Sequence, residues 1–140
     1  MPDSCAAHPC ELIWDENLTG TAESPRGDLV QVGEAGAWTP DQMVSVAVQA
    51  SLMVEFLRIA ESTGLEVLGY LSSALADAPS GEKAGRVVIS PCIVLALEHD
   101  VPRARDVLER ARARSWICSL FGDAVDLDPS YFVAPAAAPA

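Results

Sequence analysis

The chain has little positive charge, little histidine and few aromatic side chains. Its 140 residues include nine Lys and Arg against 20 Asp and Glu, two His and 6% aromatic residues, for a formal net charge of −11. A nucleic-acid-binding surface needs clustered positive charge, so this balance argues against a nucleic-acid partner. Half of the residues are apolar and 21% are charged, which indicates one globular domain and not a disordered chain.

Long hydrophobic runs are also missing. The longest apolar stretch, residues 43–57, is interrupted by Ser45, Gln49, Ser51 and Glu55, so we expect it to be too short and too interrupted to span a membrane. No positively charged segment followed by an apolar run opens the sequence, so no signal peptide is expected. These absences predict a cytoplasmic protein with no membrane partner.

Cysteine is sparse, with four residues at positions 5, 10, 92 and 118. In the cytoplasm these thiols would be reduced. Cys5, His8 and Cys10 have the spacing C-x-x-H-x-C, but a structural zinc site needs four ligands and no second cluster follows. We therefore expect no metal and no cofactor, a flexible N-terminus over residues 1–10, and Cys92 as a small buried residue of a strand.

Two segments have helical signals. Thr39, Pro40 and Gln42 form a helix start, with threonine as the N-cap, and Gly64 fits the C-terminal end. Apolar residues occupy nearly every face between these signals, which predicts a nearly fully buried helix. A second helix is expected over 101–114. Its arginines favour a solvated face, with an anionic ligand or an acidic partner as the alternative.

The remaining segments indicate strands separated by turns. Strands are expected at 11–18, 29–32, 65–76, 86–97 and 123–127. The stretch 20–36, rich in glycine, is either a hairpin or an ordered loop. Pro91 indicates that its strand is an edge strand or bulged. We predict an α+β fold with a mainly antiparallel sheet on two helices, one domain over 11–130, and a flexible Ala/Pro tail over 131–140.

Two motifs resemble those of a known family. T-P-D-Q-M from Thr39, followed by A-S at residues 50–51, is similar to the P-E-x-L…A-C signature in the central helix of OsmC/Ohr proteins. S-W-I-C at residues 115–118 is similar to their C-P-x-S signature. Without gaps, Ser51 and Ser115 occupy the positions of the two family cysteines. Asp41 then replaces the family glutamate, Trp116 the proline and Cys118 the serine.

The resemblance implies an OsmC-like fold and an intertwined homodimer with apolar clefts at the subunit interface. In the family, the first cysteine attacks an organic hydroperoxide as a thiolate, and the second captures it as a disulfide, beside an arginine and a glutamate. Arg26, the sole basic residue before the first helix, is the candidate arginine, and Asp41 is the candidate acid. Serine cannot undergo this oxidation and reduction, so the two-cysteine cycle is expected to be absent.

Several functions remain open, catalytic or not. The first is binding, with or without transformation, of a small apolar or amphipathic molecule. The second is a one-cysteine hydroperoxide reductase using Cys118, although its apolar neighbours favour a buried structural cysteine. The third is a structural or interaction protein with a collapsed pocket. Serine catalysis would need an adjacent base; Asp41 or Glu55 could serve, but Glu55 more often forms an ion pair with Arg58. The predicted ligand-binding residues are Ser51, Leu52, Phe56, Ser115, Trp116 and Phe121.

Overall fold

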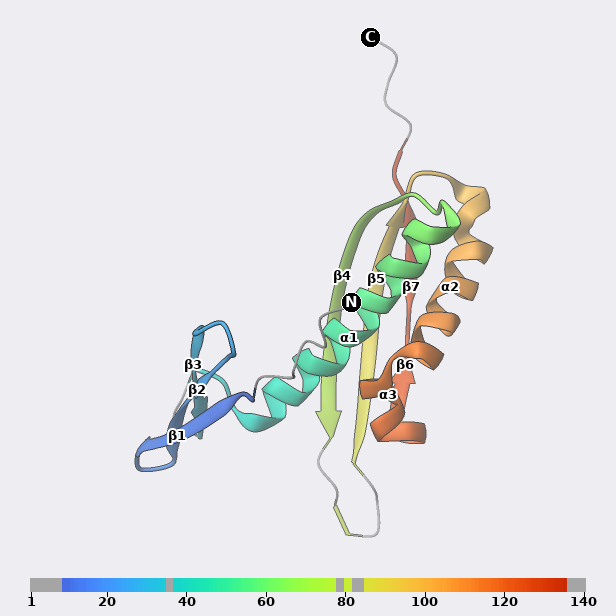
Figure 1. Ribbon diagram of the computed structural model, residues 1–140. Coiled ribbons are helices and arrows are strands. Elements are labelled where there is room, and N and C mark those ends of the chain that lie inside the picture. Colours follow the sequence, from blue (N-terminus) through green and yellow to red (C-terminus); the bar gives the residue numbers. More distant parts are fainter. Residues whose placement is uncertain (1–8, 35–36, 78–79, 82–84, 136–140) are drawn as a thin grey trace. The chain divides into compact units, whose positions relative to one another are not determined.

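The computed structural model describes residues 9–34, 37–77, 80–81 and 85–135, which fall into two compact units, Met1–Val44 and Ser45–Ala140 (Figure 1). The first unit holds strands β1 (Glu11–Glu16), β2 (Thr19–Glu23) and β3 (Leu29–Gly33). Helix α1 (Pro40–Thr63) leads into the second unit. The second unit holds β4 (Val67–Asp77), β5 (Arg86–Leu95), α2 (Val101–Arg114), α3 (Trp116–Phe121), β6 (Val125–Leu127) and β7 (Ser130–Val133). The predicted α+β class is confirmed.

The first unit is a three-stranded antiparallel meander in the order β1-β2-β3. The glycine-rich stretch is therefore a hairpin, and β2 is a strand that the sequence pattern did not indicate separately. The strand was missed because it contains Gly20, a residue that is rare in strands. Glycine is required there, since a β-carbon would lie 2.9 Å from the Ile13 carbonyl oxygen of β1. Asn17 turns the chain between β1 and β2 with a φ of 50°.

Helix α1 begins and ends where its local signals predict. The Thr39 backbone N–H donates to Gln42 Oε1 at 3.1 Å, and the Gln42 N–H donates to Thr39 Oγ1 at 3.3 Å, which is a reciprocal capping box. Gly64 follows the last helical residue with a φ of 71°, a conformation that glycine adopts without a steric penalty. Both predicted ends are confirmed.

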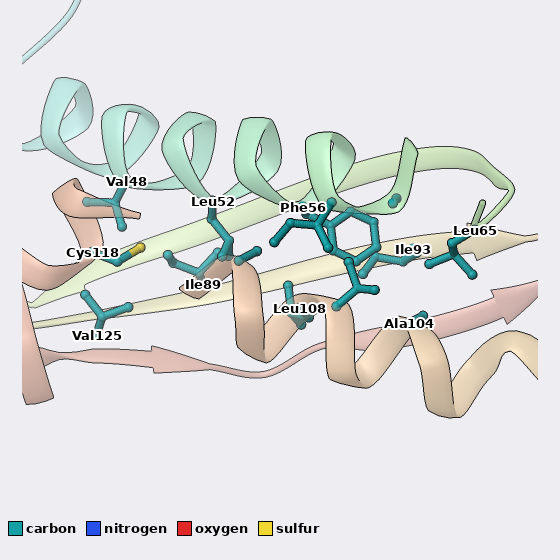
Figure 2. Packing of buried hydrophobic residues seen from close by; sticks show 14 of the residues in the cluster. Val48, Leu52, Phe56, Leu65, Ile89, Ile93, Ala104, Leu108, Cys118 and Val125 are labelled. Atoms are coloured by element: carbon teal, nitrogen blue, oxygen red, sulfur yellow. The ribbon is translucent and has the colours of Figure 1, made fainter. Parts of the chain in front are cut away.

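The second unit is a mixed sheet with α1 and α2 packed on one face. Side chains alternate along β5, and the odd-numbered ones from Val87 to Leu95 are buried. Figure 2 shows Leu52 and Phe56 of α1 and Leu108 of α2 directed toward β5. The predicted second helix, 101–114, is confirmed as α2, and its buried face consists of Ala104, Val107, Leu108 and Ala111.

Pro91 lies in the central strand of this sheet, so its predicted edge or bulge position is wrong. Strand β5 pairs with β4 along one side and with both β6 and β7 along the other. Pro91 falls between the residues paired with β6, Val87–Ile89, and those paired with β7, Cys92–Leu95. Proline has no N–H to donate, and the break in the parallel ladder places it where that ladder has no bond. Strand β7 also corrects the predicted tail, because residues 131–133 belong to the sheet.

Helix α1 is only partly buried within one chain. Its exposed apolar residues include Val46 and Val54, each 44% exposed, and Leu57, 38% exposed. The near-complete burial expected from the sequence is therefore not reached in a single copy. The expectation that this segment is too short for a membrane is also wrong, because the 24-residue helix has sufficient length and apolar composition. Its buried stripe packs on the sheet and accounts for part of that composition. The stripe consists of Val48, Leu52, Phe56, Ile59 and Ala60.

The face of the sheet opposite the helices is also apolar. Leu71 and Leu75 of β4 are 73% and 75% exposed, and Phe132 of β7 is 56% exposed. Cys92 pairs with Leu71 in the sheet register, and it is partly exposed where the sequence indicated burial. Two apolar surfaces of the second unit are thus uncovered, one on α1 and one on the sheet.

Candidate functional site

The structure brings together Ser51 and Ser115, which are 64 positions apart in the sequence. Their Oγ atoms lie 2.6 Å apart, which is a short hydrogen bond between hydroxyl groups. Ser51 belongs to α1 and is partly buried, whereas Ser115 lies between α2 and α3 and is 1% exposed. The gapless alignment of the two motifs therefore predicted a real spatial pair.

Ser115 is held in place by the two helices that it joins. Its backbone N–H donates to the Ala111 carbonyl oxygen at 2.9 Å, which ends α2. Its side chain accepts a hydrogen bond from the Cys118 N–H at 3.1 Å, which caps the start of α3. The extended backbone at Ser115, with φ −69° and ψ 107°, makes the turn between the helices. Ser115 is therefore held in position by α2 through its backbone and by α3 through its hydroxyl group.

Cys118 is a buried residue in this chain, 4% exposed, as its apolar neighbours predicted. Its side chain lies between Val48 and Val125 in Figure 2, as part of the hydrophobic core. Arg112, close to it in sequence, donates instead to the Val125 carbonyl oxygen. Cys118 is therefore a core side chain. It follows Ser115 by three residues in the sequence, but apolar side chains enclose its thiol.

The apolar residues predicted to line a ligand site separate into two groups. Leu52 and Phe56 are fully buried in the core (Figure 2). Trp116 and Phe121, on α3, are 67% and 36% exposed. One copy of the chain therefore presents aromatic groups at the surface near the buried serine Ser115, and the role of all four in binding stays a prediction.

The charged candidates are distributed over both units. Asp41 lies exposed in the first turn of α1, and Arg26 lies exposed in the turn between β2 and β3. Neither has an ion pair within the described residues, and their catalytic roles stay predictions. Glu55 binds Arg58 at 2.7 Å, so the ion-pair interpretation is confirmed over that of a base for Ser51.

The arginines of α2 mostly contact the protein itself. Arg103 donates to the Thr63 carbonyl oxygen at 2.6 Å and to Asp100 at 3.2 Å, and Arg105 lies 5.5 Å from the centre of the Tyr131 ring. These contacts favour the structural interpretation of that basic face.

The C-x-x-H-x-C segment, from which no metal site was expected, lies mostly outside the described residues. Of its three residues, Cys5 and His8 lie outside the described residues, and Cys10 is exposed. No cluster of three potential metal ligands occurs among the residues whose positions are described.

Two further polar groups near α1 had no signal in the sequence. Gln49 Oε1 accepts a hydrogen bond from the Ser72 hydroxyl at 2.6 Å, which ties α1 to β4. Tyr70 packs its ring against Phe56 at 5.6 Å between centroids, and its buried hydroxyl has no partner within the described chain. Burial raises the pKa of Tyr70 to about 12, with further contributions from Cys118 and Tyr131, so the phenol is neutral at physiological pH. The alternation along β4 identified Tyr70 as a strand residue but not as an unpaired hydroxyl.

Comparison with solved structures places this arrangement in a known fold. An OsmC-like protein of unknown function from Vibrio cholerae superimposes with a TM-score of 0.76 at 16% identity, over 87% of this chain and 97% of that one. The OsmC organic hydroperoxide resistance protein of Legionella pneumophila gives a TM-score of 0.66 at 16% identity, over 91% and 99% of the two chains. The chain has the OsmC/Ohr fold.

A third OsmC-like structure, a proposed organic hydroperoxide resistance protein from Vibrio cholerae, has captopril bound in one of its active sites. It matches with a TM-score of 0.63 at 14% identity, over 92% of this chain and 94% of that one. Sequence comparison finds no matching family model and no matching curated protein. The expected OsmC-like fold is therefore confirmed by shape, at identities too low to carry activity with it.

Proposed function

We propose that this chain is a diverged OsmC/Ohr protein that binds a small apolar or amphipathic molecule and does not run the two-cysteine peroxidase cycle. One observation carries the proposal: in an OsmC-like fold, Ser51 and Ser115 occupy the positions expected for the two cysteines, and their Oγ atoms are 2.6 Å apart. The two side chains are close enough for a reacting pair, but both carry oxygen where the peroxidase cycle needs sulfur.

The chemistry of the pair explains why the cycle is lost and not merely slowed. A peroxidatic thiolate reduces the hydroperoxide to an alcohol and becomes a sulfenic acid. The second thiol then displaces water from this sulfenic acid, and a disulfide forms. A serine oxygen can take neither oxidation step, and Cys118, 4% exposed, is not positioned to replace the first thiol.

We further propose that the functional unit is a homodimer with its ligand pockets at the subunit interface. The exposed apolar side chains of α1, such as Val54 and Leu57, support this, because a partner subunit would remove them from water. In the pocket, Ser51 supplies a polar anchor, and Trp116 and Phe121 supply apolar contacts. The captopril molecule in the Vibrio cholerae protein supports a small-molecule site in this fold. We also propose a cytoplasmic location, because Cys10, Cys92 and Cys118 are free thiols in the described part of the chain.

The first test is consumption of cumene hydroperoxide by the purified protein with dithiothreitol, alongside the Cys118→Ser variant. We expect no turnover above the background rate in either protein. Turnover that disappears in Cys118→Ser would contradict the proposal and establish a one-cysteine reductase.

A thermal-shift screen with small apolar and amphipathic compounds then tests binding directly. A ligand present at 100 times its Kd stabilises the native state by about 2.7 kcal/mol, a shift that is easily measured. A chain with a collapsed pocket would show neither turnover nor a ligand-dependent rise in Tm, which would favour the structural role instead.

A further inference from the structure

The hydrogen bond between Ser51 and Ser115 has a direction that the surroundings determine. Ser115 Oγ already accepts from the Cys118 N–H at 3.1 Å. Its own hydroxyl hydrogen still needs an acceptor, because the side chain is 1% exposed and cannot reach solvent. Among the described residues, Ser51 Oγ is the sole acceptor recorded for that hydrogen, at 2.6 Å.

The opposite direction would leave a buried hydroxyl hydrogen without a partner, which folded proteins avoid. Ser115 therefore donates to Ser51. The three groups form a chain in which the Cys118 N–H donates to Ser115 Oγ and the Ser115 O–H donates to Ser51 Oγ. Each bond in such a chain polarises the next, by roughly 10–30% per bond.

The hydroxyl hydrogen of Ser51 is the last donor in this series of hydrogen bonds. Ser51 is partly exposed, and no hydrogen bond from its hydroxyl to a helix carbonyl occurs in the described part of α1. Glu55, the charged residue one helical turn further on, is a carboxylate already bound to Arg58. The Ser51 hydroxyl is thus a polarised donor, and among the described residues no cationic side chain forms a hydrogen bond with it. Such a donor suits a neutral acceptor better than an anion, whose charge would need a cation beside it.

We propose that the Ser51 hydroxyl donates to the carbonyl oxygen of an uncharged ligand with an apolar body, such as a ketone, ester or amide. The proposal rests on the binding function proposed above and specifies its ligand class. Ser51 is the ligand-contacting group, and Ser115 is a positioning residue that orients it.

Binding of 2-octanone and octanoate, a neutral and an anionic acceptor of equal chain length, tests the ligand class by isothermal titration calorimetry. We expect the ketone to bind the full-length protein and to bind Ser51→Ala about fivefold more weakly, the loss expected for one hydrogen bond of about 1 kcal/mol. Ser51→Thr, which keeps the hydroxyl, should restore binding. Ser73→Ala, a serine exposed on the opposite face of the sheet, is the matched control and should bind as the unmodified protein does. Equal ketone affinity in Ser51→Ala, or tighter binding of octanoate than of the ketone, would overturn the proposal.

The direction of the hydrogen bond from Ser115 to Ser51 can be tested without any ligand. The buried Ser115 hydroxyl hydrogen should exchange slowly enough to appear in the proton NMR spectrum, with a cross-peak to the β-protons of Ser51. That signal should disappear in Ser115→Ala. Its absence from the unmodified protein would overturn the assigned direction. A clear signal without binding of 2-octanone would retain the direction and refute the ligand class. The thermal-shift screen decides the binding function separately, so the two failures are distinguishable.

Discussion

Replacing Ser51 and Ser115 with cysteine should recreate a disulfide across the second unit. The 2.6 Å separation of the two oxygens indicates that the β-carbons are close to the separation of about 3.5–4.5 Å that a disulfide needs. Residues 51 to 115 form a loop of 115 − 51 + 1 = 65 residues. Closing a loop of that length removes enough entropy from the unfolded chain to stabilise the fold by about 4 kcal/mol. For a domain of this size, that corresponds to a rise in Tm on the order of 10 °C.

The assay compares thermal unfolding of Ser51→Cys/Ser115→Cys with and without dithiothreitol, with disulfide formation verified by mass spectrometry after mild oxidation. The two single variants are controls, since neither can form the cross-link. We expect a large reductant-dependent difference in Tm only in the double variant. If oxidation does not link the peptides that carry positions 51 and 115 in the double variant, or if cross-linking lowers its stability, the two side chains do not meet as described.

Other predictions concern the core, the titration behaviour and the assembly. Leu52→Ala should lower the free energy of unfolding by about 2–5 kcal/mol, because it leaves a cavity at a fully buried position; urea denaturation measures this, and a loss below 1 kcal/mol would contradict the packing. Tyr70→Phe should raise the Tm, because it removes a buried hydroxyl without a partner, and a fall in Tm would show that the hydroxyl is bonded. The raised pKa of Tyr70 means that folding favours its protonated form. The free energy of unfolding therefore keeps its full value with respect to this titration below pH 10 and falls as the pH rises from 10 to about 12. Burial also raises the pKa of Tyr131, so denaturation at a series of alkaline pH values should show a reduced, not abolished, pH dependence in Tyr70→Phe. Val54→Asp should shift a homodimer toward monomer in analytical ultracentrifugation, whereas the exposed Glu61→Gln should not; equal sedimentation of both variants with the unmodified protein would exclude α1 from the interface.

The parts of the fold that the sequence predicted are those that local interactions determine. Thr39, Gln42 and Gly64 act within one or two turns of the helix that they bound, so the ends of α1 could be located without tertiary information. The serine pair could be predicted across 64 positions only because the motif resemblance brought tertiary information with it.

The errors arise where distant partners decide the structure. Pro91 indicates an edge when each strand is considered alone, but a central strand tolerates it because β6 and β7 pair with different parts of β5. The segment of β7 is too short and too close to an Ala/Pro tail to be recognised without its partner. The direction of the Ser51–Ser115 bond depends on the burial of Ser115, which no local pattern reports.

The division between β6 and β7 also limits how this sheet can grow. Asp128 and Ala134 each donate one further bond to β5, but Pro129 lies between the two strands and has no N–H to offer a new neighbour. That side of the sheet therefore presents two short segments, a form that resists pairing with another chain. The opposite side ends in β4, with 11 residues and no outer neighbour among the described strands. Strand addition, in assembly or in aggregation, is thus directed to β4, and a charged residue placed along that strand would be the economical means of preventing it.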